Sequence, residues 1–409
     1  MARKRAFGEG TIYYNDKRER WEGQFPYQDN TTGKTKRKLF TGRTQKEVAK
    51  KGNDFLKSVE GGLLPSADKI TLGQWIDCWL EDYIKPTVRV KTYEKYKASL
   101  VPYVKKKIGE TPMRNIKAPD IQRVFNEMLS SGGKNGKGLS TCTVRNTRVC
   151  LSMSYSKAVQ VGIVANNVVS MTKPPSLVKE AIQPLTAKQA SELIKVAKKN
   201  DYMPTKFFKF HSDESSDYTL ALNYAVILLA LNTGMRIGEI FVLRWPDIDF
   251  EQCTINVQRS LTHSNTQGMI FQEPKTKGSK RKISVPGSIM KELKLFKRKQ
   301  EKYIALVGSL YEDNTELVFA SWQGKPFDTK QFTRRSFKRM LEKADIEKSF
   351  SFHDLRHTHA TLLLKDGVNI KVISERLGHS TIAMTLDTYS HLMPDMQETA
   401  VRSLERIFK

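Results

Sequence analysis

Residues 377–391 read LGHSTIAMTLDTYSH, a Gly-His turn followed ten residues later by Tyr389. They close a series that begins with residues 233–239, TGMRIGE, and continues with residues 353–358, HDLRHT. The side chains of these segments that suit a phosphate group are Arg236, His353, Arg356, His379 and Tyr389. Together they indicate attack on a phosphodiester by a tyrosine hydroxyl, without a metal ion.

The whole chain is strongly basic. Its 409 residues include 69 Lys and Arg against 43 Asp and Glu, a formal net charge of +26. This excess is not confined to one tail, so it favours a nucleic acid as a partner over a merely basic soluble protein. The length exceeds that of one compact core and predicts two or three domains.

Several other classes of protein are disfavoured by the composition. The four cysteines show no CxxC spacing, so we expect neither a zinc knuckle nor a disulfide framework. The basic start lacks a following apolar segment, and the most apolar stretch, residues 220–231, is too short to span a bilayer. We therefore expect a cytoplasmic protein without membrane contact, metal or cofactor.

Residues 1–66 predict a small α+β domain with a three-stranded sheet and one helix. The strands are expected at Gly10–Tyr14, Trp21–Tyr27 and Lys36–Thr41, and the helix from the capping sequence at Thr44 to Glu60. This segment carries 15 Lys and Arg against 8 Asp and Glu, a net charge of 15 − 8 = +7. Such a sheet can enter a major groove, although a dimerisation or linker module is the alternative.

The remaining chain predicts two larger domains. Residues 67–177 show helical periodicity and predict an all-α domain, in which one helix is expected to end at Pro102. Residues 178–409 predict a mainly α domain that starts with a capping sequence at Thr186 and contains a small β-sheet at about 253–285. The fold class is therefore multidomain.

Two arginines occupy positions from which they can grip a phosphate. Arg236 follows the helix-ending pair Thr233-Gly234, and should project from a rigid turn. Arg356 lies three residues after His353, on one face of a helix expected over 352–365. A planar guanidinium donates two hydrogen bonds to a phosphate and stays protonated.

The reaction also needs a nucleophile and a general acid. A tyrosine hydroxyl titrates near pH 10, so neighbouring Arg and His charges would favour its phenolate. The leaving 5′ oxygen needs a proton, which a lysine can provide. Residues 273–286 predict two strands around a basic turn, from which Lys275 or Lys277 can reach the site.

Over nearly its whole length the chain resembles the tyrosine recombinases, specifically the integrases of phages and conjugative transposons. The resemblance rests on residues 233–239, 353–358, 377–379 and 387–391. It implies an arm-binding domain (1–66), a helical core-binding domain (67–177) and a catalytic domain with a C-terminal tail (178–409). The enzyme would cleave and rejoin DNA through a 3′-phosphotyrosine, to integrate and excise a mobile element.

The same resemblance assigns roles to residues. Arg236 and Arg356 would clamp the phosphate, His353 and His379 would hydrogen-bond it, and Tyr389 would be the nucleophile. Glu239 would support the arginines. Of the two lysines that fit the motif, we favour Lys275 over Lys277 as the general acid.

Partners follow from the resemblance as well. Four protomers would assemble on two duplexes that carry core-type and arm-type sites. An excisionase and a host DNA-bending protein would accompany the enzyme on the bacterial nucleoid. The apolar tail at 395–409 would dock on a neighbouring protomer, or else fold back on its own domain.

Other interpretations exist for these residues. A type IB topoisomerase shares the chemistry, and a catalytically silent DNA-binding regulator would share the DNA contacts. His353, His357 and His359 could suggest zinc, but no cysteine or acidic ligand accompanies them. His357 and His391 are interpreted as ordinary polar residues of helices.

Overall fold

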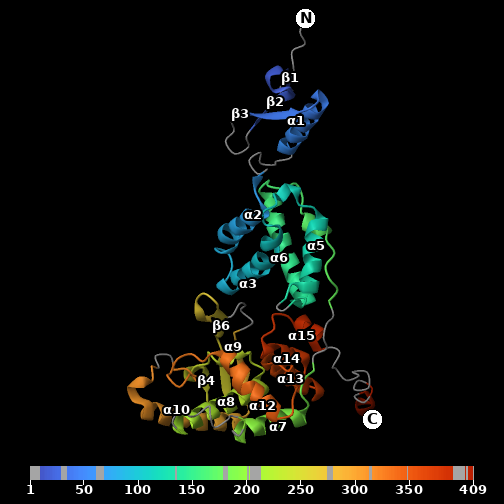
Figure 1. Cartoon of the computed structure of the whole chain (residues 1–409). Helices are drawn as coiled ribbons and strands as arrows, with labels where there is room; N and C mark the ends of the chain where they lie inside the picture. The colour runs from blue at the N-terminus through green and yellow to red at the C-terminus, as the bar shows by residue number, and fades with distance from the viewer. Residues whose placement is uncertain are drawn as a thin grey trace. The chain divides into compact units, whose positions relative to one another are not determined.

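A computed structural model describes most of the chain and divides it into two compact units, residues 1–179 and 180–409. The residues described are 10–28, 35–60, 69–133, 136–177, 183–199, 202, 213–273, 280–312, 316–347, 349–389, 401 and 404–408. Figure 1 shows the helices and strands of both units.

The first unit begins with the small α+β domain. Strands β1 (Thr11–Asn15), β2 (Arg20–Gln28) and β3 (Thr35–Gly42) form an antiparallel sheet in the order β1-β2-β3. Helix α1 (Gln45–Glu60) covers one face of this sheet (Figure 1). Phe25, Val48 and Phe55 are buried between them. The expected strands and helix are confirmed, and the Glu47 amide donates to the Thr44 hydroxyl as the capping sequence predicts.

The remainder of the first unit is helical. Its main helices are α2 (Leu72–Cys78), α3 (Val90–Leu100), α5 (Ala118–Ser131) and α6 (Thr141–Gln160). They enclose one apolar core that contains Trp75 and Trp79. The buried Trp75 indole donates to the Ser154 carbonyl oxygen over 3.1 Å, which ties α2 to α6.

The expectation that a helix ends at Pro102 is wrong. The helix continues through a π-helical turn at Val101–Lys105 into α4 (Lys106–Ile108). Proline lacks an N–H and interrupts ordinary α-helical bonding, but the wider turn accommodates it because the Lys106 amide bonds to the Val101 carbonyl oxygen. A second π-helical turn, Trp79–Ile84, extends α2.

The second unit is mainly helical. Its helices are α7 (Ala187–Lys199), α8 (Asp213–Thr233), α9 (Ile237–Ile240), α10 (Gly287–Val307), α11 (Thr329–Phe332), a π-helical turn (Thr333–Phe337), α12 (Lys338–Lys343), α13 (Phe352–Lys365), α14 (Ile370–Leu377) and α15 (Ile382–Tyr389). Short 3-10 turns lie at Trp245–Asp247 and Gly308–Leu310 in this unit, and at Asp16–Arg18, Met113–Asn115 and Val168–Met171 in the first unit. The Thr186 capping sequence is confirmed, because the Gln189 amide donates to the Thr186 hydroxyl over 3.2 Å.

Helix α8 runs through the centre of the second unit. It contacts α7, α10 and α13, and its apolar side chains, from Leu222 to Leu231, are buried around much of its circumference. A helix that is apolar on all sides belongs in a core. Among the described helices, none combines the length and apolar character that crossing a bilayer requires.

The small β structure expected at about 253–285 is confirmed, whereas the first of the two strands expected within 273–286 lies largely outside the described residues. Strands β4 (Ile248–Asp249), β5 (Thr254–Val257) and β8 (Arg281–Ser284) form one sheet, and β6 (Ser260–Ser264) pairs with β7 (Gly268–Gln272). Strands β7 and β8 therefore belong to different sheets. With this sheet, the predicted fold class is confirmed.

Candidate active site

The turn that carries Arg236 is held by close packing. Helix α8 ends at Thr233, and Gly234 follows in the left-handed region with φ +64°. A Cβ atom on Gly234 would lie 2.7 Å from the ring of His359 and 2.8 Å from the side chain of Leu377. Both the backbone conformation and this close packing therefore require glycine here. Arg236 lies two residues after Gly234 and is the N-cap residue of α9. This position fixes the backbone from which the Arg236 side chain projects.

Glu239 holds Arg236 and a second arginine together. Its carboxylate accepts hydrogen bonds of 2.9 Å from both the backbone amide and the guanidinium of Arg236. It also forms an ion pair of 2.9 Å with the guanidinium of Arg281 on β8. Burial alone would raise the pKa of Glu239, but the charges of Arg281 and Arg236 hold the pKa below its ordinary value. The carboxylate therefore stays ionised and aligns Arg236.

Arg356 lies on α13 and bridges the two turns of the site. Its guanidinium donates to the Gly234 carbonyl oxygen over 2.9 Å and to the Leu377 carbonyl oxygen over 2.6 Å. The residue is 2% exposed, whereas the side chain of Arg236 is 38% exposed. Burial and the charge of Arg236 lower the pKa of Arg356, yet a guanidinium titrates so high that it stays protonated.

His353 and Arg236 line one cavity. This cavity has a volume of about 270 Å³ and is walled by Met235, Arg236, Ile237, Gly238, Ser260, Leu261, Phe352 and His353. Burial, His357 and the charges of Arg356 and Arg236 lower the pKa of His353 to about 4. The imidazole is therefore neutral at neutral pH and can share a hydrogen bond with a ligand in the cavity.

His379 follows Gly378, which ends α14 with φ +68°. Its Nδ1 atom lies 2.8 Å from the hydroxyl of Thr385 on α15. Burial and the charges of Arg356, Arg236 and Arg281 lower the pKa of His379 to about 4. This imidazole, too, is neutral and close to the arginine cluster.

Tyr389 ends α15 and is fully buried, with 0% of its surface exposed. Its ring belongs to a small core formed with α13 and α14, which includes Ala360, Leu364, Ile373 and Leu377. Its hydroxyl lies 2.7 Å from the Nδ1 atom of His357. Burial raises the pKa of Tyr389 to about 12, although the charge of Arg356 acts in the opposite direction. The hydroxyl is therefore protonated in this state.

The structure thus brings together five of the six expected site residues: Arg236, His353, Arg356, His379 and Tyr389. The sixth, Lys275, and its alternative Lys277 lie outside the described residues. The same holds for His391.

Two site residues were missed by sequence reasoning. His357 was interpreted as an ordinary polar residue, but it touches the Tyr389 hydroxyl. Arg281 was not singled out, but it contacts Glu239 and donates from Nε to the Arg376 carbonyl oxygen over 2.6 Å. The sequence offered one indication for His357, which is its position directly after Arg356. No sequence pattern indicated a role for Arg281.

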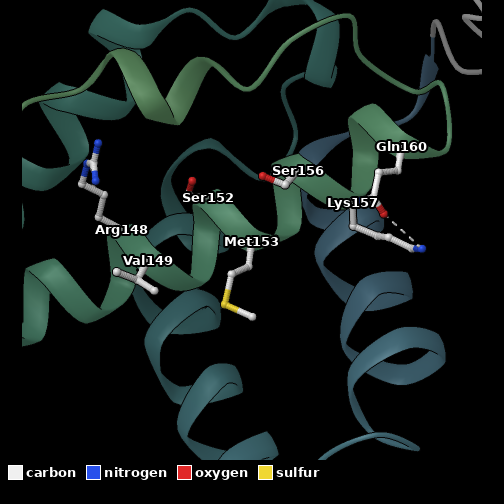
Figure 2. A pocket seen from close by; sticks show the side chains of 7 residues that line it. All are labelled: Arg148, Val149, Ser152, Met153, Ser156, Lys157 and Gln160. Atoms are coloured by element: carbon white, nitrogen blue, oxygen red, sulfur yellow. Dashed lines mark hydrogen bonds between the residues drawn. The ribbon is translucent and has the colours of Figure 1, made fainter.

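Another hollow, on α6 of the first unit, carries no comparable chemistry. It has a volume of about 430 Å³, and Figure 2 shows the seven residues that line it, from Arg148 to Gln160. Arg148 is already bonded to the hydroxyl and carbonyl oxygens of Thr172, and Lys157 reaches Gln160. These polar groups stabilise the local fold.

Two of the three histidines considered for zinc, His353 and His357, meet edge to face, but the third bonds elsewhere. His357 faces Tyr389, and the buried His359 places its Nδ1 atom 2.8 Å from the Leu231 carbonyl oxygen. Within the part of the chain that the structure describes, no three His, Cys, Asp or Glu side chains form a group able to hold a metal ion.

Comparison with known proteins gives two family matches. The model of the phage integrase family matches residues 183–396, and the model of the phage integrase N-terminal SAM-like domain matches residues 71–129. A tyrosine recombinase XerC-like protein of Caldanaerobacter subterraneus subsp. tengcongensis is 30% identical over 391 residues, covering 92% of this chain and 93% of that relative.

Solved structures share the fold. The Tn1549 transposon integrase in complex with a circular intermediate DNA has a TM-score of 0.63 at 21% identity, covering 83% of this chain and 99% of that chain. A lambda integrase tetramer bound to a Holliday junction has a TM-score of 0.51 at 18% identity, covering 96% of this chain and 97% of that chain.

The family assignment follows from the extent of these matches. One family model spans more than half of the chain, and a relative at 30% identity spans nearly all of it. The chain therefore belongs to the phage integrase family of tyrosine recombinases, enzymes that cleave and rejoin DNA.

Proposed function

We propose that this protein is the integrase of a mobile DNA element and that Tyr389 is its nucleophile. The observation that carries the proposal is the convergence of a tyrosine, two arginines and two neutral histidines in the second unit. The Tyr389 oxygen attacks the phosphorus atom, a 3′-phosphotyrosine forms and the 5′ oxygen leaves. The 5′-hydroxyl of a new partner strand then attacks the phosphorus atom of the phosphotyrosine. This step joins the two strands and releases Tyr389. The bond energy is conserved in the phosphotyrosine, so the reaction needs no nucleotide.

The two arginines stabilise the charge that grows on the phosphate oxygens. Arg236 is the more accessible, and Glu239 orients it before DNA arrives. Arg356 is held by two carbonyl oxygens, so little reorganisation is needed when charge develops beside it. His353 and His379 are neutral and hydrogen-bond the phosphate without competing with the arginines for its charge.

We assign the general acid to Lys275. Strand β8, which follows the lysine-bearing segment, begins at Arg281, and Arg281 contacts Glu239 beside Arg236. Lys275 precedes Arg281 by six residues, so the described chain that follows it lies beside the proposed phosphate site.

Lys275→Ala is expected to slow cleavage by about 10²- to 10⁴-fold, the usual contribution of a general acid. A substrate with a 5′-thiol leaving group should restore the rate, because a thiolate leaves without a proton. Lys277→Ala is the matched control and should cleave nearly as the wild type does. Single-turnover kinetics on both substrates measure this, and the reverse pattern would assign the acid to Lys277.

The domains divide the DNA contacts between them. We assign arm-type sites to residues 1–66, core-type sites to residues 67–177 and catalysis to residues 178–409. The sheet face opposite α1 supports the first assignment, because Arg37 and Leu39 share it and both are exposed. Strands with such a face can enter a major groove.

Removing residues 1–66 is expected to leave core-site cleavage intact and to abolish protection of the accessory sites. Arg37→Gln should weaken accessory binding in the full chain, while Lys46→Gln on the exposed side of α1 is the matched control. Accessory binding should also fall steeply with salt, because phosphate contacts release counterions. Identical footprints of the full-length and shortened proteins would contradict the arm-binding role.

Assembly completes the proposal. Four protomers bind two duplexes at the nucleoid, with an excisionase and a host DNA-bending protein that set the direction of the reaction. The lambda integrase tetramer on a Holliday junction supports this arrangement by its fold. The tail at 395–409 docks on a neighbouring protomer, in agreement with the exposure of Val401, Leu404 and Ile407 at 53%, 52% and 67%.

A further inference from the structure

His357 makes the polar contact of the proposed nucleophile. Its Nδ1 atom lies 2.7 Å from the Tyr389 hydroxyl, and the two ring centroids are 5.6 Å apart with an interplanar angle of 62°. The contact joins α13 to α15 across 32 residues of sequence. The meaning of this contact for catalysis rests on the proposed role of Tyr389.

The direction of this hydrogen bond follows from the state of both groups. Burial raises the pKa of Tyr389 to about 12, so the phenol keeps its hydrogen. Burial lowers the pKa of the His357 imidazole from its ordinary value, which favours the neutral form. A buried hydroxyl donates where it can. The phenol therefore donates to Nδ1, and the imidazole carries its hydrogen on Nε2.

The other histidines of the site are engaged elsewhere. His353 lines the cavity with Arg236 and meets His357 edge to face, at a centroid distance of 4.9 Å. His379 contacts the Thr385 hydroxyl, and His359 contacts the Leu231 carbonyl oxygen. Among the described residues, His357 is the base in contact with the Tyr389 hydroxyl.

We propose that His357 positions Tyr389 and accepts its proton as the phenol oxygen attacks the phosphate. The bond from the Tyr389 oxygen to phosphorus forms, the bond from phosphorus to the 5′ oxygen breaks, and the phenol proton moves to Nδ1 of His357. The 5′ oxygen takes its proton from the general acid. In rejoining, the 5′-hydroxyl attacks phosphorus and His357 returns the proton to the departing phenol.

The charged groups around His357 are compatible with this role. Asp354 on the same helix favours the imidazolium, and Arg356 opposes it. His353 on α13 and His379 after α14 are neutral neighbours, and Tyr389 faces His357 from α15. The proton thus moves to a group that Asp354 stabilises once it is charged.

The test is single-turnover formation of the covalent adduct on a nicked suicide substrate, from about pH 5 to about pH 9. Wild-type cleavage should fall as pH drops through the pKa of His357, because a protonated imidazole cannot accept the proton. His357→Ala should lose about 10²-fold or more, lose this acid limb, and recover in part with added imidazole. His357→Gln keeps a hydrogen-bond acceptor but should stay slow, because an amide does not take up a proton.

A matched control and a substituted nucleophile separate this role from folding. His359→Gln changes a buried histidine of the same helix that does not touch Tyr389, so it should retain the wild-type pH profile even where thermal stability falls. A fluorinated tyrosine at position 389 has a more acidic hydroxyl and should shrink the penalty of His357→Ala.

Three outcomes would overturn the inference. His357 variants that are slow but keep the wild-type pH profile and ignore imidazole would show a structural role alone. Variants that cleave at the wild-type rate would remove His357 from the reaction. Variants that cleave faster would show that the contact only holds Tyr389 in its buried position. An adduct formed without the Tyr389 hydroxyl would instead refute the proposed function.

Discussion

Tyr389→Phe is expected to bind DNA as the wild type does and to form no covalent adduct. The substitution removes one oxygen atom and keeps the ring, which packs with Ala360, Leu364 and Leu377 in the small core of α13, α14 and α15. The hydroxyl makes a hydrogen bond to His357, so its loss should change the free energy of unfolding by about 1 kcal/mol or less. The expected loss of cleavage is complete, because phenylalanine offers no oxygen to attack phosphorus.

Trapping on a nicked suicide substrate, followed by denaturing electrophoresis, measures this result. Tyr303→Phe is a suitable control, because Tyr303 is also a buried tyrosine of the second unit and its hydroxyl bonds to the Trp322 carbonyl oxygen. That variant should form the adduct at the wild-type level. A denaturant-stable adduct in Tyr389→Phe would show that another residue is the nucleophile.

Loss of either arginine should slow cleavage by about 10²- to 10³-fold, or about 2.7–4 kcal/mol of barrier, the scale seen when one preorganised donor is removed. Arg236→Lys keeps the positive charge beside Glu239 but loses the planar fork that bonds two phosphate oxygens. Its effect should therefore fall on cleavage and leave folding nearly unchanged.

Arg356→Ala should slow cleavage at least as much and should also lower thermal stability. The variant leaves the Gly234 and Leu377 carbonyl oxygens without the guanidinium that joins the two turns. Arg259→Lys is the control, since Arg259 pairs with Asp247 at 2.8 Å in the same unit and is not among the residues that line the cavity. Single-turnover cleavage and thermal melts measure both effects. Near-normal cleavage by Arg236→Lys would remove Arg236 from the phosphate site.

The local elements of the fold were largely predictable. Capping sequences at Thr44 and Thr186 marked the starts of α1 and α7, and the helix expected over 352–365 has those bounds. Such signals act within one turn of chain, so they can be recognised in sequence. The predicted helix end at Pro102 was wrong because a π-helical turn carries the helix past this proline. Such a turn has no sequence signature.

The sequence by itself determined the family, the fold class and the identity of the expected site residues, because the arginine, histidine and tyrosine motifs occur in short segments with definite turns. The tertiary structure alone decided which neighbours complete the site. Arg281 reaches Glu239 across 42 residues, and His357 rather than His353 meets the Tyr389 hydroxyl. Such contacts depend on how α13, α14, α15 and β8 pack, and packing is a property of the assembled core rather than of any local pattern.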